Sequence, residues 1–309
     1  MRKIAFLFPG QGSQYVGMGK EFYKVYREAK EIFQQANEIL GFDIKRLCFE
    51  GPEEELENTI NTQPAIFIVN WIITEVLKEK GIKPAVVAGH SLGEYNAVLA
   101  SGILDFPSVL RLVRRRAQLM EEASSKVDGG MAAVIGLERG KIISTCKNIE
   151  EVVEAVNFNS PSQIVISGEK KGIEKAAKHL IKEGAKRVIP LPVSGPFHTS
   201  LIKEAGDKFS SELNKLNFSI PQCKIITNAF ASYVFTPEEA KRALKQQMNH
   251  PVLWEDSMKK LILDGIDLFI EVGPGSVLQN LLRRIDKKAN TSGVETPSDI
   301  ERLEKLLKA

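Results

Sequence analysis

One stretch of the sequence reads Val86-Val87-Ala88-Gly89-His90-Ser91-Leu92-Gly93-Glu94-Tyr95. An apolar run that favours a β-strand ends at Gly89, and a helix-like run continues from Glu94 to Ala100. Ser91 therefore stands in a Gly-x-Ser-x-Gly pattern between a strand and a helix, which is typical of a nucleophile elbow. Glycines on both sides of the serine remove side chains that would clash in so sharp a turn. The pattern predicts a nucleophilic serine; the alternative is a strand-to-helix turn with an incidental serine.

The same turn predicts where negative charge is stabilised. An elbow exposes the Ser91 hydroxyl at the carboxyl edge of the sheet and places the backbone N–H of Leu92 at the start of a helix. Because a helix N-terminus carries partial positive charge, this N–H can stabilise an oxyanion.

The composition is that of a soluble globular protein. The 309 residues suffice for one large domain or two ordinary ones, with 43% apolar and 26% charged residues. The 42 basic and 39 acidic residues nearly balance, which argues against a nucleic-acid partner. The longest apolar run, Ala65 to Leu77, is too short and too polar to span a membrane. Three widely spaced cysteines show no disulfide framework and no metal motif, so we expect reduced thiols, no bound metal and a cytoplasmic location.

A parallel sheet is predicted for the main body of the chain. Apolar runs near residues 4–8, 85–89, 224–227 and 267–272 read as strands, and three of them end in glycine-rich turns. The helices expected around them cover residues 19–40, 52–58, 63–80, 105–124, 201–216, 237–248 and 251–264, a stretch after Gly275, and a last helix opened by a capping box at 298–301. Residues 290–296 read as a polar loop. A site at the carboxyl edge of the sheet is the expectation for such a fold.

The middle of the chain has a different order of predicted strands and helices. After a linker at 126–130, strands are expected at 131–137, 152–157, 163–167 and 186–191, with helices at 138–148 and 170–182. The order β-α-β-β-α-β is that of a ferredoxin-like unit. We therefore predict an α/β protein with an α/β-hydrolase-like large subdomain, residues 1–125 and 195–309, and an inserted ferredoxin-like small subdomain, residues 126–194.

A serine nucleophile needs a base, and the chain has four histidines. His90 adjoins Ser91, His179 falls within a predicted helix, and His250 precedes a proline at a helix start. His198 lies in a turn just before a helix and is the best placed base; the alternative is an ordinary loop histidine. No acidic partner stands out, so a backbone carbonyl or an amide is left to orient the imidazole.

Eight stretches together resemble the malonyl-CoA:acyl carrier protein transacylases of bacterial fatty-acid synthesis, over nearly the whole chain. They are Phe8–Gln14, Thr62–Ala65, Gly89–Tyr95, Arg116 with Leu119-Met120, Asn157–Pro161, Gly195–His198, Gln247 with Asn249–Val252, and Glu271–Gly275. The resemblance implies an acyltransferase that moves a malonyl group from malonyl-CoA to the phosphopantetheine thiol of acyl carrier protein. It implies a ping-pong reaction through a malonyl-serine ester, with a coenzyme A thioester as substrate and no cofactor.

The resemblance also assigns roles to residues. Ser91 would be the nucleophile and His198 the general base, the N–H groups of Gln11 and Leu92 would form the oxyanion hole, and a main-chain carbonyl near Gln247 would orient the histidine.

Three further residues would shape the acyl pocket. Arg116 stands among Arg111, Arg114 and Arg115, a density that usually marks a solvated helix face. The resemblance instead implies that Arg116 holds the malonyl carboxylate through two hydrogen bonds, with Gln63 beside it. Phe197 matches the residue found in family members that accept a malonyl group, and its bulky ring would leave no room for an extra methyl group on the substrate. Ala117 stands where many relatives have glycine.

Other functions remain open at this point. A serine thioesterase or other hydrolase shares the serine and the histidine but needs no arginine for an acyl carboxylate. An acyltransferase of a polyketide pathway is a closer alternative, and a non-catalytic protein that docks a carrier domain is a more distant one. Two basic clusters, Lys186 with Arg187 and Arg283, Arg284, Lys287 with Lys288, are candidate docking sites for an acidic carrier or ordinary solvated residues.

Overall fold

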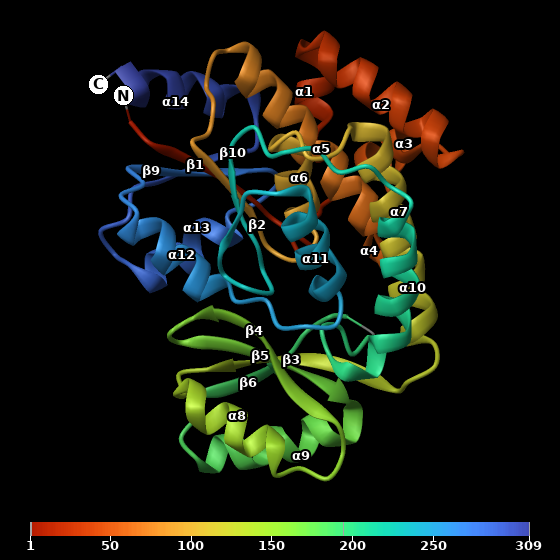
Figure 1. The fold of residues 1–309 in the computed structure, drawn as a ribbon, viewed down its shortest axis with the longest axis vertical. Helices are drawn as coiled ribbons and strands as arrows, with labels where there is room; N and C mark the ends of the chain where they lie inside the picture. The colour runs from red at the N-terminus through yellow and green to blue at the C-terminus, as the bar shows by residue number, and fades with distance from the viewer. Residues whose placement is uncertain (1, 194, 309) are drawn as a thin grey trace.

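The larger part of the molecule is built on a parallel sheet. The computed structural model describes residues 2–193 and 195–308, and within them six strands form one sheet in the order β10-β9-β1-β2-β7-β8 (Figure 1). The strands are β1 (Ile4–Phe8), β2 (Val86–Gly89), β7 (Lys224–Ile226), β8 (Tyr233–Val234), β9 (Leu268–Val272) and β10 (Thr291–Val294). All four predicted strands are present and run parallel as neighbours β9, β1, β2 and β7. β10 adds a parallel edge strand, and β8 an antiparallel one at the other edge.

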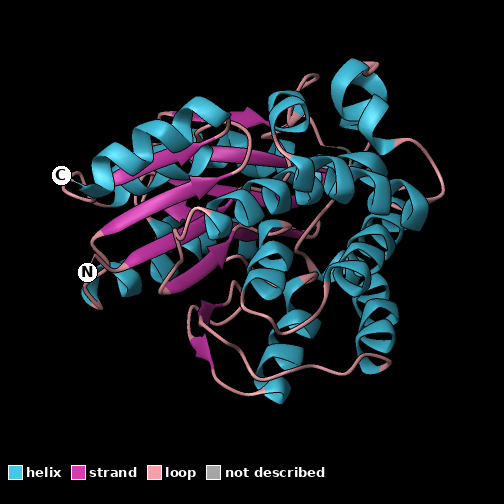
Figure 2. Ribbon diagram, turned by 90° about the horizontal axis from the view of Figure 1, so that it is seen from above, coloured by secondary structure: helices cyan, strands magenta, loops and turns pink. Residues whose placement is uncertain are grey.

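Helices cover both faces of this sheet (Figure 2). Alternate residues of a strand point to opposite faces. Phe6 and Phe8 therefore pack into one core with α5 (Thr59–Glu79) and α7 (Phe106–Ser124). Ala5 and Leu7 pack into the other with α12 (Trp254–Leu263) and α13 (Val277–Ile285). The central strands β1, β2 and β9 are buried on both sides, as expected for a parallel sheet.

The smaller part is an antiparallel sheet with two helices on its outer face (Figure 1). Within the described chain its strand order is β4-β5-β3-β6, formed by β3 (Gly129–Ile135), β4 (Val153–Ser160), β5 (Gln163–Glu169) and β6 (Arg187–Pro190). The helices are α8 (Arg139–Lys147) and α9 (Lys170–Lys182). The predicted β-α-β-β-α-β order is confirmed, and the strand order is that of a ferredoxin-like sheet. Residue 194, where the inserted subdomain was expected to end, lies outside the described residues, and the proposed subdomain boundaries stay a prediction.

The remaining helices belong to the larger part of the molecule. They are α1 (Lys20–Val25), α2 (Arg27–Leu40), α3 (Ile44–Glu50), α4 (Glu53–Glu57), α6 (Gly93–Ala100), the 3₁₀ turn at Ser200–Ile202, α10 (Lys203–Asn214), α11 (Pro237–Gln247) and α14 (Pro297–Lys308). No helix in the described part of the chain is long and apolar enough to cross a membrane.

Three predicted helices differ at their boundaries. The helix expected at 63–80 begins four residues earlier, at Thr59. The helix expected at 19–40 is broken at Tyr26, which is extended at φ −107° and ψ 133°. Phe22, Ala29 and Phe33 are buried on both sides of the break, so the apolar spacing could not reveal it. The helix expected from Pro251 begins at Trp254 instead, because the backbone of Val252 pairs with β4 through Val156 and Phe158.

Two predictions near the C-terminus were wrong. The polar loop expected at 290–296 contains β10, which is held to β9 by backbone hydrogen bonds rather than by apolar side chains. The capping box expected at Ser298–Glu301 is displaced by two residues. The Asp299 carboxylate accepts hydrogen bonds from the N–H of Thr296 and from its hydroxyl, so α14 starts at Pro297.

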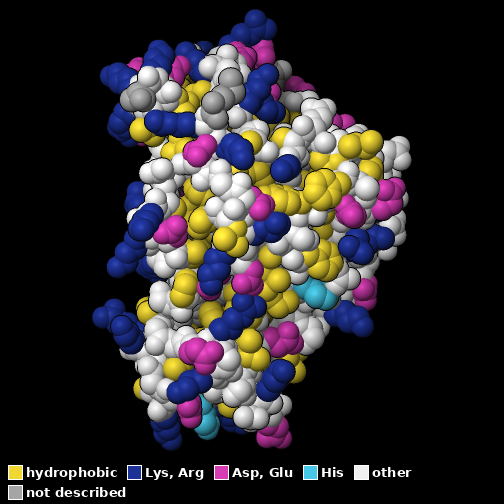
Figure 3. Space-filling view, turned by 60° about the vertical axis from the view of Figure 1, so that its left-hand side comes forward, with side chains coloured by type: hydrophobic (Ala, Val, Ile, Leu, Met, Phe, Trp, Pro, Cys, Tyr) yellow, Lys and Arg dark blue, Asp and Glu magenta, His cyan; other side chains and the backbone are white. Residues whose placement is uncertain are grey.

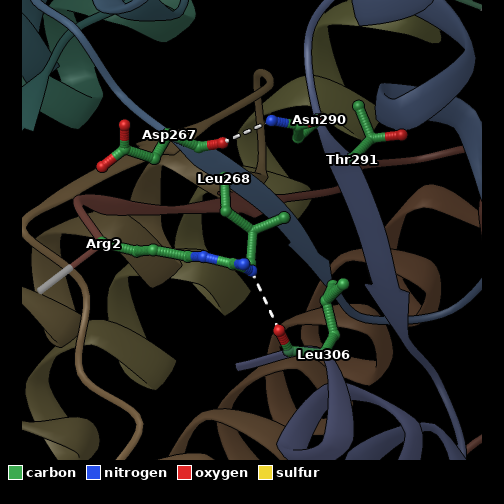
Figure 4. Close-up of a pocket in the computed structure, with 6 residues that line it drawn as sticks. All are labelled: Arg2, Asp267, Leu268, Asn290, Thr291 and Leu306. Atoms are coloured by element: carbon green, nitrogen blue, oxygen red, sulfur yellow. Dashed lines mark hydrogen bonds between the residues drawn. The ribbon is translucent and has the colours of Figure 1, made fainter. Parts of the chain in front are cut away.

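The amino edge of the large sheet holds a separate pocket of about 600 Å³ (Figure 4). Arg2 reaches across it and donates to the Leu306 carbonyl at 2.9 Å, near the end of α14. Asn290 donates to the Asp267 carbonyl at 3.1 Å. The first bond ties the start of β1 to the last helix, and the second joins the residues just before β9 and β10. Both lie on the edge opposite the carboxyl ends of the strands.

Candidate active site

The turn around Ser91 has the geometry of a nucleophile elbow. β2 ends at Gly89 and α6 begins at Gly93, and Ser91 between them has φ +50°. A Cβ at Gly89 would overlap the backbone of Gly93, and a Cβ at Gly93 would overlap the Phe8 carbonyl, so both positions require glycine. A left-handed serine costs about 1–3 kcal/mol and persists only where its surroundings hold it.

His198 lies directly against the serine. Its Nε2 is 2.8 Å from Ser91 Oγ, and its Nδ1 is 3.0 Å from the backbone carbonyl of Gln247. With the carbonyl accepting from Nδ1–H, Nε2 is left free to accept the serine proton. His198 has φ +64°; Ser91, His198 and Ala231 are the non-glycine residues with positive φ in the described chain. The two residues of the expected nucleophile–base pair are thus both held in an unfavourable backbone conformation.

The histidine of this pair is shielded from water, whereas Ser91 is partly exposed. His198 is 2% exposed, and burial, with the Arg116 charge second, lowers the pKa of His198 to about 3. At neutral pH the imidazole is therefore uncharged and able to take a proton.

The other histidines are placed differently. His179 and His250 are exposed on the surface. The partly buried His90 ring lies against Trp254, with Nε2 2.7 Å from Asn159 Oδ1. His90 also lines the pocket, although its ring makes no hydrogen bond to Ser91 in the described chain.

Arg116 is in the site and not on a solvated helix face. It is 1% exposed, and its Nη1 donates to Gln63 Oε1 at 2.8 Å. Its Nη2 donates to Ser91 Oγ at 3.1 Å and to Gln247 Oε1 at 3.2 Å. Among the described residues, no carboxylate lies within ion-pair distance of this guanidinium, and the Glu94 carboxyl that acts on its pKa is mostly protonated near neutral pH, because burial raises the Glu94 pKa to about 8. A buried cation without an anion is costly, so the site has an unmet requirement for negative charge beside the serine.

A small cavity of about 100 Å³ opens onto these residues. It is lined by Gln11, His90, Ser91, Leu92, Arg116, Met120, Met131, Asn157, Leu191, Val193, Phe197 and His198. The loops after β1 and β2 meet here, since a Cβ at Gly10 would lie 3.5 Å from the Leu92 nitrogen. Neither the Gln11 nor the Leu92 N–H donates to another group in the described chain, so both are available to a substrate oxygen.

The structure thus brings together every residue named from the sequence: Ser91, His198, Gln11, Leu92, Arg116, Gln63, Phe197 and Gln247. The sequence reasoning missed Asn228, which bonds to the elbow from the end of β7. The rule that sites form at the carboxyl ends of parallel strands could have found it. No group of three or more His, Cys, Asp or Glu side chains within residues 2–193 and 195–308 could hold a metal ion.

Comparison with known proteins identifies the class. The acyl transferase domain family matches residues 5–300, so the chain belongs to that family.

Within that family, the chain is 42% identical over 304 residues to the malonyl CoA-acyl carrier protein transacylase of Bacillus subtilis, covering 97% of this chain and 96% of that protein. The solved malonyl CoA-acyl carrier protein transacylase of Coxiella burnetii superposes with a TM-score of 0.97 at 36% identity, over 100% and 98% of the two chains. A malonyl-transacylase in complex with a type II polyketide acyl carrier protein superposes with a TM-score of 0.95 at 38% identity, over 98% and 99%.

Proposed function

We propose that this protein transfers a malonyl group from malonyl-CoA to the phosphopantetheine thiol of acyl carrier protein, in fatty-acid synthesis. The observation that carries the proposal is the buried Arg116 guanidinium, which lies 3.1 Å from Ser91 Oγ and has no carboxylate within ion-pair distance in the described chain. A malonyl group differs from an acetyl group by a carboxylate, which is the anion this site requires. The full-length similarity to malonyl CoA-acyl carrier protein transacylases supports the same substrate.

The first half of the reaction acylates the serine. His198 Nε2 takes the proton of Ser91 as Oγ attacks the thioester carbonyl. The N–H groups of Gln11 and Leu92 stabilise the oxyanion, and a planar Arg116 guanidinium holds the malonyl carboxylate. When the intermediate collapses, the C–S bond breaks, His198 returns the proton to the sulfur, and coenzyme A leaves a malonyl-serine ester.

The second half reverses these roles. The carrier's pantetheine thiol gives its proton to His198 and attacks the ester carbonyl. The C–O bond to Ser91 then breaks, and His198 returns the proton to Oγ. The Gln247 carbonyl keeps the imidazole in one tautomer throughout, but stabilises an imidazolium less than a carboxylate would. The reaction as written calls for no cofactor.

A hydrolase is the competing assignment, because water could replace the thiol in the second half. The buried arginine favours transfer, since a general esterase gains nothing from an acyl carboxylate site. A carrier from a polyketide pathway is a narrower alternative that uses the same chemistry. The cytoplasm stays the predicted location, and the free thiols of Cys48, Cys146 and Cys223 fit a reducing compartment.

Intact-protein mass spectrometry after mixing with malonyl-CoA alone tests the proposal. Wild type should gain a malonyl-sized increment that Ser91→Ala does not, and added acyl carrier protein should discharge it. Release of free malonate at the rate of transfer would identify a hydrolase instead. No adduct and no turnover would show that malonyl-CoA is not the donor.

A further inference from the structure

The Ser91 peptide is held from both sides by amide side chains of distant segments. Its N–H donates to Asn228 Oδ1 at 2.7 Å, and its carbonyl accepts from Gln247 Nε2. Asn228 Nδ2 also donates to the Gly89 carbonyl at 2.6 Å. Asn228 therefore bridges the last residue of β2 and the serine, and closes the elbow from the end of β7.

Asn228 is itself fixed by a buried carboxyl group. Its backbone N–H donates to Glu94 Oε1 at 3.3 Å, and its carbonyl accepts from the Leu253 N–H at 2.9 Å. Glu94 is fully buried at the start of α6, and its Oε2 has no hydrogen-bond partner in the part of the chain that the structure describes. Burial raises the pKa of Glu94 to about 8, so near neutral pH the carboxyl is mostly protonated and acts as a neutral acceptor.

We propose that Asn228 and Glu94 are positioning residues that hold Ser91 in its left-handed conformation with Oγ aimed at His198. This rests on the proposed role of Ser91 as the nucleophile. A residue at φ +50° relaxes unless its surroundings over-determine it. The two Asn228 side-chain bonds restrain the strand side of the turn, and the bond to Glu94 ties Asn228 to the first turn of α6 on the helix side. Loss of these bonds lets Oγ drift from Nε2, and displacement of a reacting group by about 1 Å can cost about 100-fold in rate.

The test is the rate at which a fluorophosphonate labels Ser91 in the full-length protein, followed by intact mass at saturating reagent. This reagent reports nucleophile geometry and needs neither malonyl-CoA nor carrier. Asn228→Ala should label about 10- to 100-fold more slowly than wild type, by the same argument. The matched control is Asn96→Ala, which removes a buried asparagine of α6 that bonds Asn70 and the Phe67 carbonyl but not Ser91.

The control should label within about three-fold of wild type, although its melting temperature also falls, since each buried hydrogen bond contributes about 1 kcal/mol. Equal slowing by Asn96→Ala and Asn228→Ala would overturn the proposal, because the effect would then be general loss of packing. If Asn228→Ala does not fold, Asn228→Asp keeps the acceptor for the Ser91 N–H and loses the donor to Gly89. It should also label about ten-fold more slowly, and a wild-type rate would overturn the bridging role.

Glu94 is tested by the conservative variant. Glu94→Gln keeps an acceptor for the Asn228 N–H and should label within about three-fold of wild type, whereas Glu94→Ala should be about ten-fold slower. Equal loss in both variants would mean that ionisation matters, which overturns the acceptor role. If wild type labels at Ser91 but transfers no malonyl group, the proposed function fails while the positioning role stands. If Ser91 does not label in wild type, the positioning role fails.

Discussion

Arg116 is the residue whose surroundings say most about substrate. Arg116 is buried on α7, on the same side as Val113 one helical turn earlier. Arg111 of the same helix is exposed to solvent. Burial lowers the pKa of Arg116, but a guanidinium stays charged in proteins, so its charge must be balanced when the site closes on a substrate.

Arg116→Ala should therefore lower malonyl-serine formation by about 100-fold or more, since a hydrogen bond to a charged group contributes about 1.5–3 kcal/mol and two are lost. Relative preference should shift towards acetyl-CoA. Arg111→Ala is the control and should leave both rates unchanged. The measurement is the single-turnover acylation rate with each thioester. An unchanged malonyl-to-acetyl ratio would remove Arg116 from the acyl pocket.

His198 predicts an unusual pH dependence. Because its pKa is lowered to about 3, the imidazole of the free protein stays neutral through the range in which an ordinary histidine becomes charged. We expect kcat/KM for malonyl-CoA to show no loss with a midpoint near pH 6.5 as the pH falls from 8 to 5. A stopped-flow pH profile at constant ionic strength measures this, and a single ionisation near 6.5 would contradict the structure.

Glu94 predicts a pH dependence of stability. Its folded pKa of about 8 lies above the ordinary glutamate value, so the folded state binds a proton that the unfolded state has already lost. Its contribution to stability is therefore fully present below about pH 4.5 and is lost as the pH rises towards 8. The melting temperature of wild type should fall relative to Glu94→Gln between pH 5 and 8. A constant difference across that range would show that Glu94 does not titrate there.

At the scale of the element, the elbow depends on two backbones passing without side chains between them. Gly93→Ala places a methyl group against the Phe8 carbonyl of β1 and should cost at least about 3 kcal/mol in the free energy of unfolding. Gly41→Ala, at the end of α2 with φ +76° and open space around it, should cost only about 1 kcal/mol. Urea unfolding of both variants tests the difference, and equal costs would mean that α6 can shift away from β1.

At the scale of the molecule, the cavity lies between the two sheets. Ser91, Arg116 and His198 come from the large part, whereas Met131 and Asn157 come from β3 and β4. The parts are joined by the pairing of Val252 with β4 and by an ion pair of Arg139 with Asp256. A cavity built in this way opens at the junction, where a carrier could deliver its pantetheine arm.

Two basic clusters on the surface are candidate docking sites for an acidic carrier protein. Basic and acidic side chains are interspersed on the face in Figure 3, which fits the net charge of +3. Both basic clusters named above are exposed, and Arg284 also contacts Gln163 of β5. Charge reversal at the cluster that binds an acidic carrier should raise KM for the carrier and weaken its salt dependence, with KM for malonyl-CoA unchanged. If reversal at both clusters leaves KM for the carrier unchanged, neither is the docking site.

Much of the fold follows from local patterns. Apolar runs located four of the parallel strands, three of which end in glycine-rich turns, and the order of elements between residues 129 and 190 predicted the second sheet. The sequence did not predict β10, because this strand depends on backbone pairing with β9. It did not predict the break at Tyr26 either, because the break leaves the apolar spacing of the helix intact.

The sequence by itself determined the elbow, because its pattern lies within one short strand–turn–helix segment, where a Cβ at Gly89 would overlap the backbone of Gly93 four residues on. It also placed His198 in a turn before a helix. Only the tertiary structure decided that Arg116 is buried beside Ser91, and that Asn228, 137 residues away, bonds the serine N–H. Residue spacing reports which face of an element is buried, but long-range hydrogen bonds and the burial of a charge depend on how distant elements pack.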